Sequence, residues 1–166
     1  MDIQKELIAE FDREVALTRK VLAAIPEDVD FSWKPHPKSY SIGGLTGHVA
    51  EIPGEWALQT LTTDKLEWSA ESSKPYVVES KADLLERFDK GSNKSKAALA
   101  ALDPAKWDDN WKMVAGDQAW IDDTRYRVFR DWVLNHGVHH RAQLCVDLRL
   151  LNVKVPGVYG PSADEM

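Results

Sequence analysis

Cysteine is nearly absent from this sequence of 166 residues. Cys145 is the only one, so no disulfide can form within the chain, and a reducing compartment is favoured. Long apolar runs are also absent, and the first residues lack the hydrophobic segment of a signal peptide. We therefore expect a cytoplasmic protein with no membrane partner.

Positive charge is scarce as well. Lysine and arginine together number 21 against 27 acidic residues, which gives a net charge of -6, and no basic tract is longer than two residues. A nucleic-acid surface needs clustered lysine and arginine to neutralise phosphates. We therefore expect no nucleic-acid partner.

The remaining composition is that of an ordinary globular protein. Hydrophobic residues make up 43% and charged residues 29% of the chain, and no repeat or low-complexity segment interrupts it. A chain of this length can bury a sizeable core in one unit. We expect residues 1–166 to form a single domain.

Apolar residues at three- and four-residue spacing predict four amphipathic helices. The first covers residues 2–25 and is stopped by Pro26. The second begins after a Ser41 N-cap and continues to Trp56, with a kink or break at Pro53. The third begins with a weak capping box at residues 80–83 and continues to Pro104.

The fourth helix is predicted from Asp123 or Thr124 to about Leu151. Before it, residues 111–114 and 118–121 are typical of a short hairpin around Gly116, and the chain from Val155 is irregular. The predicted fold class is all-α: a four-helix bundle with a short β-hairpin or irregular segment between helices three and four.

Histidine spacing in the fourth helix suggests a metal site. His136 and His140 lie four residues apart, so both imidazoles leave the same face one turn apart, at the centre of the apolar stripe. His48 lies on the apolar stripe of the second helix. Three neutral imidazoles from two helices can bind one divalent cation and leave a coordination position open.

The alternative is that these are core histidines bonded to neighbouring polar groups. Two imidazoles at the centre of a buried apolar face are expected to find too few hydrogen-bond partners there. Each neutral ring has one donor and one acceptor, and both need a partner away from water. His139 falls at the edge of the stripe, Cys145 points away from it, and His36 lies in a proline-flanked loop, so none of them is counted as a ligand.

Two polar residues are further candidates. Gln143 shares the face of the histidine pair and is the candidate catalytic residue, bonding a water or substrate at the metal. Glu51 follows His48 by one turn and could orient a ligand ring. An ordinary surface or boundary position is the competing interpretation for both.

Seven tryptophans are many for a chain of this length. We expect most of them to fill the core, and the alternative is an aromatic wall beside the metal. Residues 159–165 could fold over the mouth of the site, although a frayed terminus is the default expectation.

Several segments resemble the DinB family of small bacterial proteins. Residues 34–39 and 41–51 are similar to the start of the second helix in that family, and residues 135–144 are similar to its most recognisable motif. Residues 18–22 and 159–165 also match, so the likeness covers nearly the whole chain. Ala142 stands where many members carry glycine, which should change local packing only.

The resemblance implies a four-helix bundle of up-down-down-up order and often a homodimer. It also implies a divalent metal, typically zinc or nickel, on three histidines, which correspond here to His48, His136 and His140. Better-understood relatives are thiol-dependent transferases and isomerases that use bacillithiol, mycothiol or glutathione.

We therefore expect a divalent-metal-dependent enzyme acting on a small-molecule substrate. It would be a thiol S-transferase that uses a low-molecular-weight thiol, or a hydrolase that activates water. No Ser–His–Asp or Cys–His arrangement offers a competing nucleophile. The alternatives are a non-catalytic, stress-related metal-binding module and a metal-free dimeric bundle.

Overall fold

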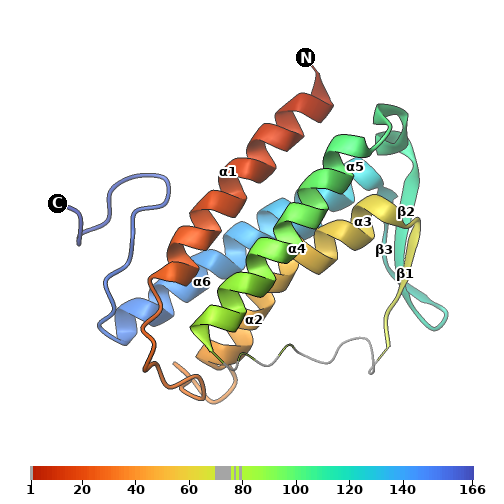
Figure 1. The fold of residues 1–166 in the computed structure, drawn as a ribbon. Helices are drawn as coiled ribbons and strands as arrows, with labels where there is room; N and C mark the ends of the chain where they lie inside the picture. The colour runs from red at the N-terminus through yellow and green to blue at the C-terminus, as the bar shows by residue number, and fades with distance from the viewer. Residues whose placement is uncertain (1, 70–75, 77, 79) are drawn as a thin grey trace.

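Helical segments dominate the computed structural model, which describes residues 2–69, 76, 78 and 80–166. In the described part of the chain they form four long stretches that lie side by side (Figure 1). These stretches are α1 (Ile3–Ala23); α2 (Ile42–Glu51), η1 (Ile52–Trp56) and α3 (Ala57–Thr62); α4 (Lys81–Ala101); and α5 (Arg125–Val128), η3 (Phe129–Asn135) and α6 (His136–Leu150). A short 3₁₀ turn, η2 (Pro104–Asp108), follows α4.

The predicted helix starts are confirmed by their capping contacts. The hydroxyl of Ser41 accepts a hydrogen bond from the Gly44 N–H, and that of Ser80 accepts one from the Asp83 N–H, both at 3.1 Å. Thr124 caps α5 in the same way. The first helix ends two residues earlier than predicted, because Ile25 N–H bonds the Leu22 carbonyl in a tighter final turn.

The predicted kink at Pro53 is a π-helical turn, η1. Proline cannot donate a backbone hydrogen bond, so the regular α pattern cannot pass through it. A second π-helical turn, η3, directly precedes His136 and was not predicted. A π-helical turn contains one extra residue, which changes the direction in which the following side chains point. The apolar residues of the segment are the same in either kind of turn, so a hydrophobic pattern does not reveal it.

A three-stranded sheet of order β1-β2-β3 covers one end of the helices (Figure 1). Strands β2 (Asn110–Ala115) and β3 (Gln118–Thr124) form the predicted hairpin, with Gly116 at φ 59° in its turn. Strand β1 (Lys65–Glu67) pairs in parallel with β2 and was not predicted. Three residues are too few for a readable alternation of apolar and polar side chains.

Three clusters of buried apolar residues hold these elements together. The first joins α1, α2, α4 and α6, and the second joins α1 to η1, α4 and η3. The third lies between the sheet and the helices and contains Trp111, Met113 and Val128. It fixes the sheet against the helices beside the three histidines described below.

The predominantly helical fold and the hairpin are as predicted. The small sheet makes the fold less purely helical than the all-α class suggested. The up-down-down-up order and the single domain of residues 1–166 stay predictions. Among the described residues, every helix is too short or too polar to cross a lipid bilayer.

Candidate metal centre

Three histidines meet between α2 and α6. His140 Nε2 lies 2.8 Å from His136 Nε2, which lies 3.3 Å from His48 Nε2. One nitrogen from each ring falls within 4.8 Å of the other two. The tertiary structure therefore brings together the three residues that the sequence analysis selected as ligands.

Apolar packing places His48 against the pair on α6. Leu45 and Val49 on α2 belong to the same buried cluster as Leu144 on α6. His48 lies between Leu45 and Val49 in the sequence, so the packing of α2 on α6 carries its ring toward His136 and His140.

Hydrogen bonds on the far side of two rings fix their orientation. His136 Nδ1 lies 3.3 Å from the Trp132 carbonyl oxygen, and His140 Nδ1 lies 2.8 Å from Gln143 Oε1. Both partners are acceptors, so each Nδ1 donates its proton. In a neutral ring, the lone pair is then on Nε2, the atom that faces the other histidines.

Lone pairs that face one another at 2.8 Å repel unless a proton or a cation lies between them. Burial, with a smaller contribution from the neighbouring imidazoles, lowers the pKa of His48 and of His136 to about 4. Burial also lowers the pKa of His140. The rings are therefore neutral at pH 7, and the donor set suits a metal cation better than a proton.

Gln143 lies behind His140 and not in the cavity that the histidines face. Its side chain is exposed, and its amide oxygen accepts the His140 Nδ1 proton. This contact supports an orienting function for Gln143. A direct contact between Gln143 and substrate stays a prediction.

A cavity of about 720 Å³ adjoins the histidines. His136 and four tryptophans form much of its wall, and the ring centroids of Trp132 and Trp56 lie 4.9 and 6.1 Å from that of His136. Trp56 lies 4.9 Å from Trp132 and 5.6 Å from Trp68. The wall is therefore a continuous aromatic surface that begins at the histidines.

The expectation that the tryptophans mainly fill the core is only partly correct. Trp107 and Trp111 are buried in the second and third apolar clusters, but Trp56, Trp68 and Trp132 are less buried and line the cavity, to which Trp111 also contributes. The sequence held a usable signal, since Trp132 precedes His136 by one turn and therefore lies on the same face.

Glu51 also lines the cavity. Burial raises its pKa to about 6, nearby Glu55 adds to the shift, and Arg87 opposes it. Among the described contacts, Glu51 accepts a hydrogen bond from the backbone of Tyr76 and makes none with a histidine ring. The expected orientation of a ligand ring by Glu51 is therefore not seen.

A second cavity, of about 380 Å³, borders the first, and both are lined by Glu51, Glu55, Gln59, Tyr76 and Arg87. Beside Arg87, its lining includes Lys90 and Lys94, which also lie on α4. Positive charge thus gathers along one helix face beside the histidine cavity, although the chain as a whole is acidic.

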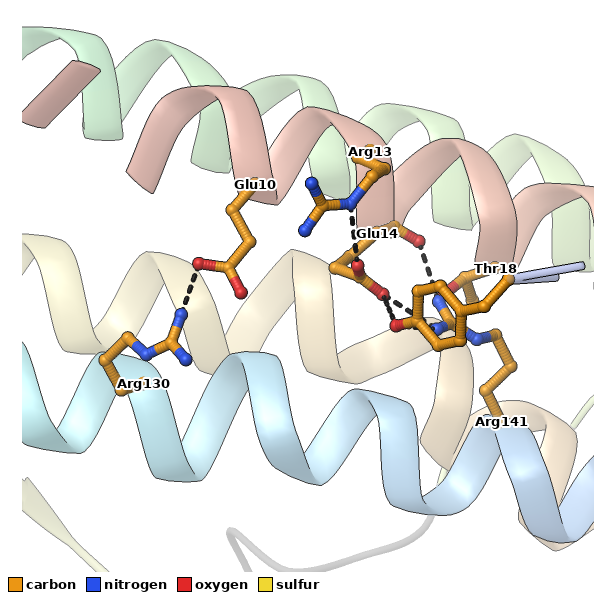
Figure 2. A network of polar contacts seen from close by, with 7 residues as sticks. Glu10, Arg13, Glu14, Thr18, Arg130 and Arg141 are labelled. Atoms are coloured by element: carbon orange, nitrogen blue, oxygen red, sulfur yellow. Dashed lines mark hydrogen bonds and ion pairs between the residues drawn. The ribbon is translucent and has the colours of Figure 1, made fainter. Parts of the chain in front are cut away.

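On the side of α6 away from the histidines, Arg141 forms a buried polar network with α1 (Figure 2). Its guanidinium donates to Glu14 Oε2 at 2.7 Å and to Thr18 Oγ1 at 3.1 Å. The Tyr159 hydroxyl completes the network, 2.6 Å from Glu14 and 2.7 Å from Arg141.

The C-terminal segment is therefore neither frayed nor folded over the cavity. Tyr159 joins it to α1 and α6, and Asp164 pairs with Arg149 at 2.6 Å. A short irregular segment gives no apolar period that would show which surface it covers, so the sequence could not place it.

The excluded candidates stay outside the centre. His139 is exposed, although its ring lies 4.8 Å from that of His140. Cys145 packs against the first apolar cluster, and His36 Nδ1 accepts a hydrogen bond from the Lys38 N–H in its loop. None of the three belongs to the group that could hold a metal in the described part of the chain.

Comparison with known proteins gives one family and a common fold. The sequence model of the DinB family matches residues 1–166. A DinB-like protein from Bacillus cereus is 21% identical, with a TM-score of 0.71 over 93% of this chain and 97% of that chain. A DinB-like protein from Bacillus subtilis is 19% identical, with a TM-score of 0.68 over 92% of this chain and 97% of that chain. Among curated proteins, no sequence gives a significant match.

Proposed function

We propose that this chain, which belongs to the DinB family, is a divalent-metal-dependent enzyme of the thiol S-transferase or hydrolase type. His48, His136 and His140 would hold the metal. The observation that carries the proposal is the meeting of three neutral ring nitrogens within 4.8 Å of one another beside a large cavity.

The donor set fits zinc or nickel, since both metals bind imidazole nitrogen well. Three protein ligands are typical of catalytic sites, which keep one position open, whereas structural zinc sites are closed by four ligands. When bound, such a metal lowers the pKa of a coordinated thiol or water and supplies a nucleophile at neutral pH.

The surrounding residues would orient, exclude water and accept a proton. Gln143 and the Trp132 carbonyl hold two rings with Nε2 toward the centre. The tryptophans shield the reacting groups from water. Glu51, with its pKa raised to about 6, is ionised at pH 7 and basic enough to take the proton of the incoming thiol or water on its carboxylate.

The charged wall of the second cavity favours the thiol version of the reaction. Low-molecular-weight thiols such as glutathione carry carboxylates, and Arg87, Lys90 and Lys94 would attract them. An aromatic wall on the other side would hold the electrophile. The hydrolase version requires no such cationic wall.

Metal analysis tests the first part of the proposal. Protein purified without an affinity tag should contain about one equivalent of divalent metal. His140→Ala should lose the metal and stay helical, and His139→Ala, an exposed neighbour, should retain it. A metal-free wild-type protein would overturn the proposal in favour of a metal-free bundle.

Calorimetric titration of the metal-loaded protein with bacillithiol, mycothiol and glutathione tests the second part. One of them should bind, and Lys90→Ala with Lys94→Ala should weaken binding about tenfold or more. Lys96→Ala is the matched control, since Lys96 lies on the same helix but pairs with Asp12 at 2.8 Å. Absence of any thiol binding would favour the hydrolase or a non-catalytic metal-binding module.

A homodimer and the up-down-down-up order of helices complete the proposal. Val146 and Leu150 on α6 support the dimer, since both are more than half exposed and lie one turn apart. Light scattering on the purified protein measures its mass in solution and tests the homodimer.

A further inference from the structure

We infer that the histidine cavity binds an aryl carboxylate, whose ring system would lie against the tryptophan wall and whose carboxylate would be bound by Arg87. The inference rests on the proposed function only for the reaction of such a molecule after it binds, as the electrophile of the transferase or the substrate of the hydrolase. Lys90 and Lys94 line the second cavity only and remain available to a thiol.

The tryptophan wall is the first observation. Trp56, Trp68 and Trp132 line the cavity and are partly exposed, so a molecule in the cavity can touch them. The Trp56 ring is inclined by 51° to that of Trp132 and by 48° to that of Trp68. An aryl group can lie flat on one such ring while its edge meets the next, and aromatic rings favour both arrangements. The volume of about 720 Å³ is within the range of small-molecule sites.

The same geometry disfavours a bound cation. An aromatic cage surrounds a cation with ring faces on several sides. Here the centroids of neighbouring tryptophans are only 4.9 and 5.6 Å apart, so the rings pack against one another and leave no gap between their faces. Arg87 in the same lining would also repel a cation. The wall therefore suits a flat, uncharged ring system.

Arg87 is the second observation. It lines both cavities, and it makes no ion pair or hydrogen bond with any described residue. Its Cζ lies 3.8 Å from the centroid of the Tyr76 ring, so the guanidinium lies over that ring. The Tyr76 hydroxyl donates to Asp83, one turn earlier on α4, which holds the ring in place. The guanidinium thus offers its planar set of N–H donors, which matches the geometry of a carboxylate.

The distance between Arg87 and the histidines limits the size of the molecule. The charge of Arg87 acts on Glu51, so the two side chains lie near each other. Glu51 follows His48 by three residues on α2, which is a rise of about 4.5 Å along the helix. A molecule held by Arg87 therefore reaches the histidines across about one helical turn, which one or two fused rings can span.

The charges that the two cavities share favour an anion on the α4 side. The acidic residues, Glu51 and Glu55, belong to α2 and η1. The cations, Arg87 with Lys90 and Lys94 beyond it, all belong to α4. The carboxylate would therefore bind toward α4, and the uncharged rings would extend toward the tryptophans.

Calorimetric titration of the purified protein with three probes of similar size tests this inference. They are 2-naphthoate, the neutral 2-naphthamide, and decahydro-2-naphthoate, which keeps the carboxylate on a puckered, saturated ring system. 2-Naphthoate should bind about fivefold to tenfold more tightly than the amide, because Arg87 binds the charge. It should also bind about fivefold more tightly than the saturated acid, because only the flat rings stack on tryptophan.

Arg87→Gln should abolish the preference for 2-naphthoate over the amide and keep the preference for the aryl ring system. Lys96→Gln is the matched control and should keep both preferences, since Lys96 lies on the same helix but outside both linings. Trp68→Leu should reduce the preference for the aryl ring system. If Trp68→Leu fails to fold, the wild-type comparison with the saturated acid decides alone.

Equal wild-type affinity for 2-naphthoate and either of the other probes would overturn the inference. Metal content is measured on the same sample. An Arg87-dependent preference in metal-free protein would support the aryl carboxylate site while contradicting the proposed metal function. A carboxylate preference that survives Arg87→Gln in metal-loaded protein would place the carboxylate elsewhere, which contradicts this inference and leaves the proposed metal function intact.

Discussion

At the scale of single residues, two oxygen atoms determine which nitrogen of each α6 histidine faces the centre. The Trp132 carbonyl and the Gln143 amide oxygen each lie beside an Nδ1 atom. Without such an acceptor, a neutral imidazole can carry its proton on either nitrogen and rotate. We therefore expect the affinity of the proposed site for metal to depend also on residues that would not touch the metal.

Gln143→Ala should lower metal affinity about 10- to 100-fold, because His140 loses the acceptor that fixes its tautomer. Competition with a chromogenic chelator measures the affinity. His139→Ala on the same helix turn is the control and should leave the affinity unchanged. An unaltered affinity in Gln143→Ala would show that this contact does not orient the ligand.

The pKa of Glu51 makes stability depend on pH. Its folded value of about 6 lies above the ordinary value of 4.5, so the folded protein binds more protons than the unfolded chain between these pH values. The free energy of unfolding should therefore decrease as the pH rises through this window and stay lower above it.

Glu51→Gln should remove this dependence and raise the free energy of unfolding at pH 7.5 by about 1 kcal/mol, a figure reduced for the partial exposure of the carboxyl. Below pH 4.5 the free energies of unfolding of the wild type and Glu51→Gln should become similar. Urea unfolding at several pH values measures the difference, with Glu86→Gln on exposed α4 surface as the control. If Glu51 accepts the substrate proton, activity should also fall in Glu51→Gln although stability rises.

At the scale of elements, the contact between η1 and α4 shapes the wall of the second cavity. A Cβ atom on Gly91 would lie 3.0 Å from Gly54 Cα, so the two backbones touch with no room for a side chain. Ser95 Oγ donates to the Gly54 carbonyl at 2.6 Å and satisfies an acceptor in the π-helical turn. This close approach holds η1, and with it Trp56, in place.

Gly91→Ala should destabilise the protein by about 1–2 kcal/mol, because the backbone clash exceeds the gain in helix propensity. Gly44→Ala is the matched control, since its Cβ would meet Ser41 Oγ at an ordinary 3.4 Å and should stabilise α2 slightly. Chemical denaturation compares both with the wild type. A stabilised Gly91→Ala would mean that α4 can move away at little cost.

At the scale of the whole molecule, the Arg141 network joins the first helix, the last helix and the C-terminal segment (Figure 2). Arg141 is 2% exposed, and hydrogen bonds and opposite charge from Tyr159 and Arg141 outweigh burial and keep the pKa of Glu14 below its ordinary value. Since Arg141 directly follows His140, one turn of α6 carries both a proposed metal ligand and a residue that anchors α6 to α1.

Arg141→Met should destabilise the protein by about 3–5 kcal/mol, because Glu14 then loses its buried charge partner and keeps only the more exposed Arg13. Adding Glu14→Gln should recover part of the loss, since a neutral amide costs less to bury. Arg13→Met, whose ion pair with Glu14 is largely exposed on the arginine side, should change stability much less. If Arg141→Met and the double variant with Glu14→Gln lost the same free energy of unfolding, this account of the network would be contradicted.

Local sequence patterns were sufficient for much of the fold. The caps at Ser41 and Ser80 and the turn at Gly116 depend on contacts or backbone angles within a few residues, so each could be predicted from its neighbours. The ligand candidates His136 and His140 also follow from one helical period. Strand β1 and the π-helical turn η3 could not be predicted, since the first depends on pairing with distant β2.

The helices, the hairpin and the inward face of the histidine pair follow from local sequence, because they depend on interactions between residues close together in the chain. Long-range packing, in contrast, brings His48 to the pair, places Gln143 behind His140, and buries Trp111 beside the cavity with no partner for its N–H among the described residues. Each of these contacts depends on how α2, α6 and the sheet pack against one another. That packing depends on the shapes of the buried surfaces, which a local hydrophobic period does not determine.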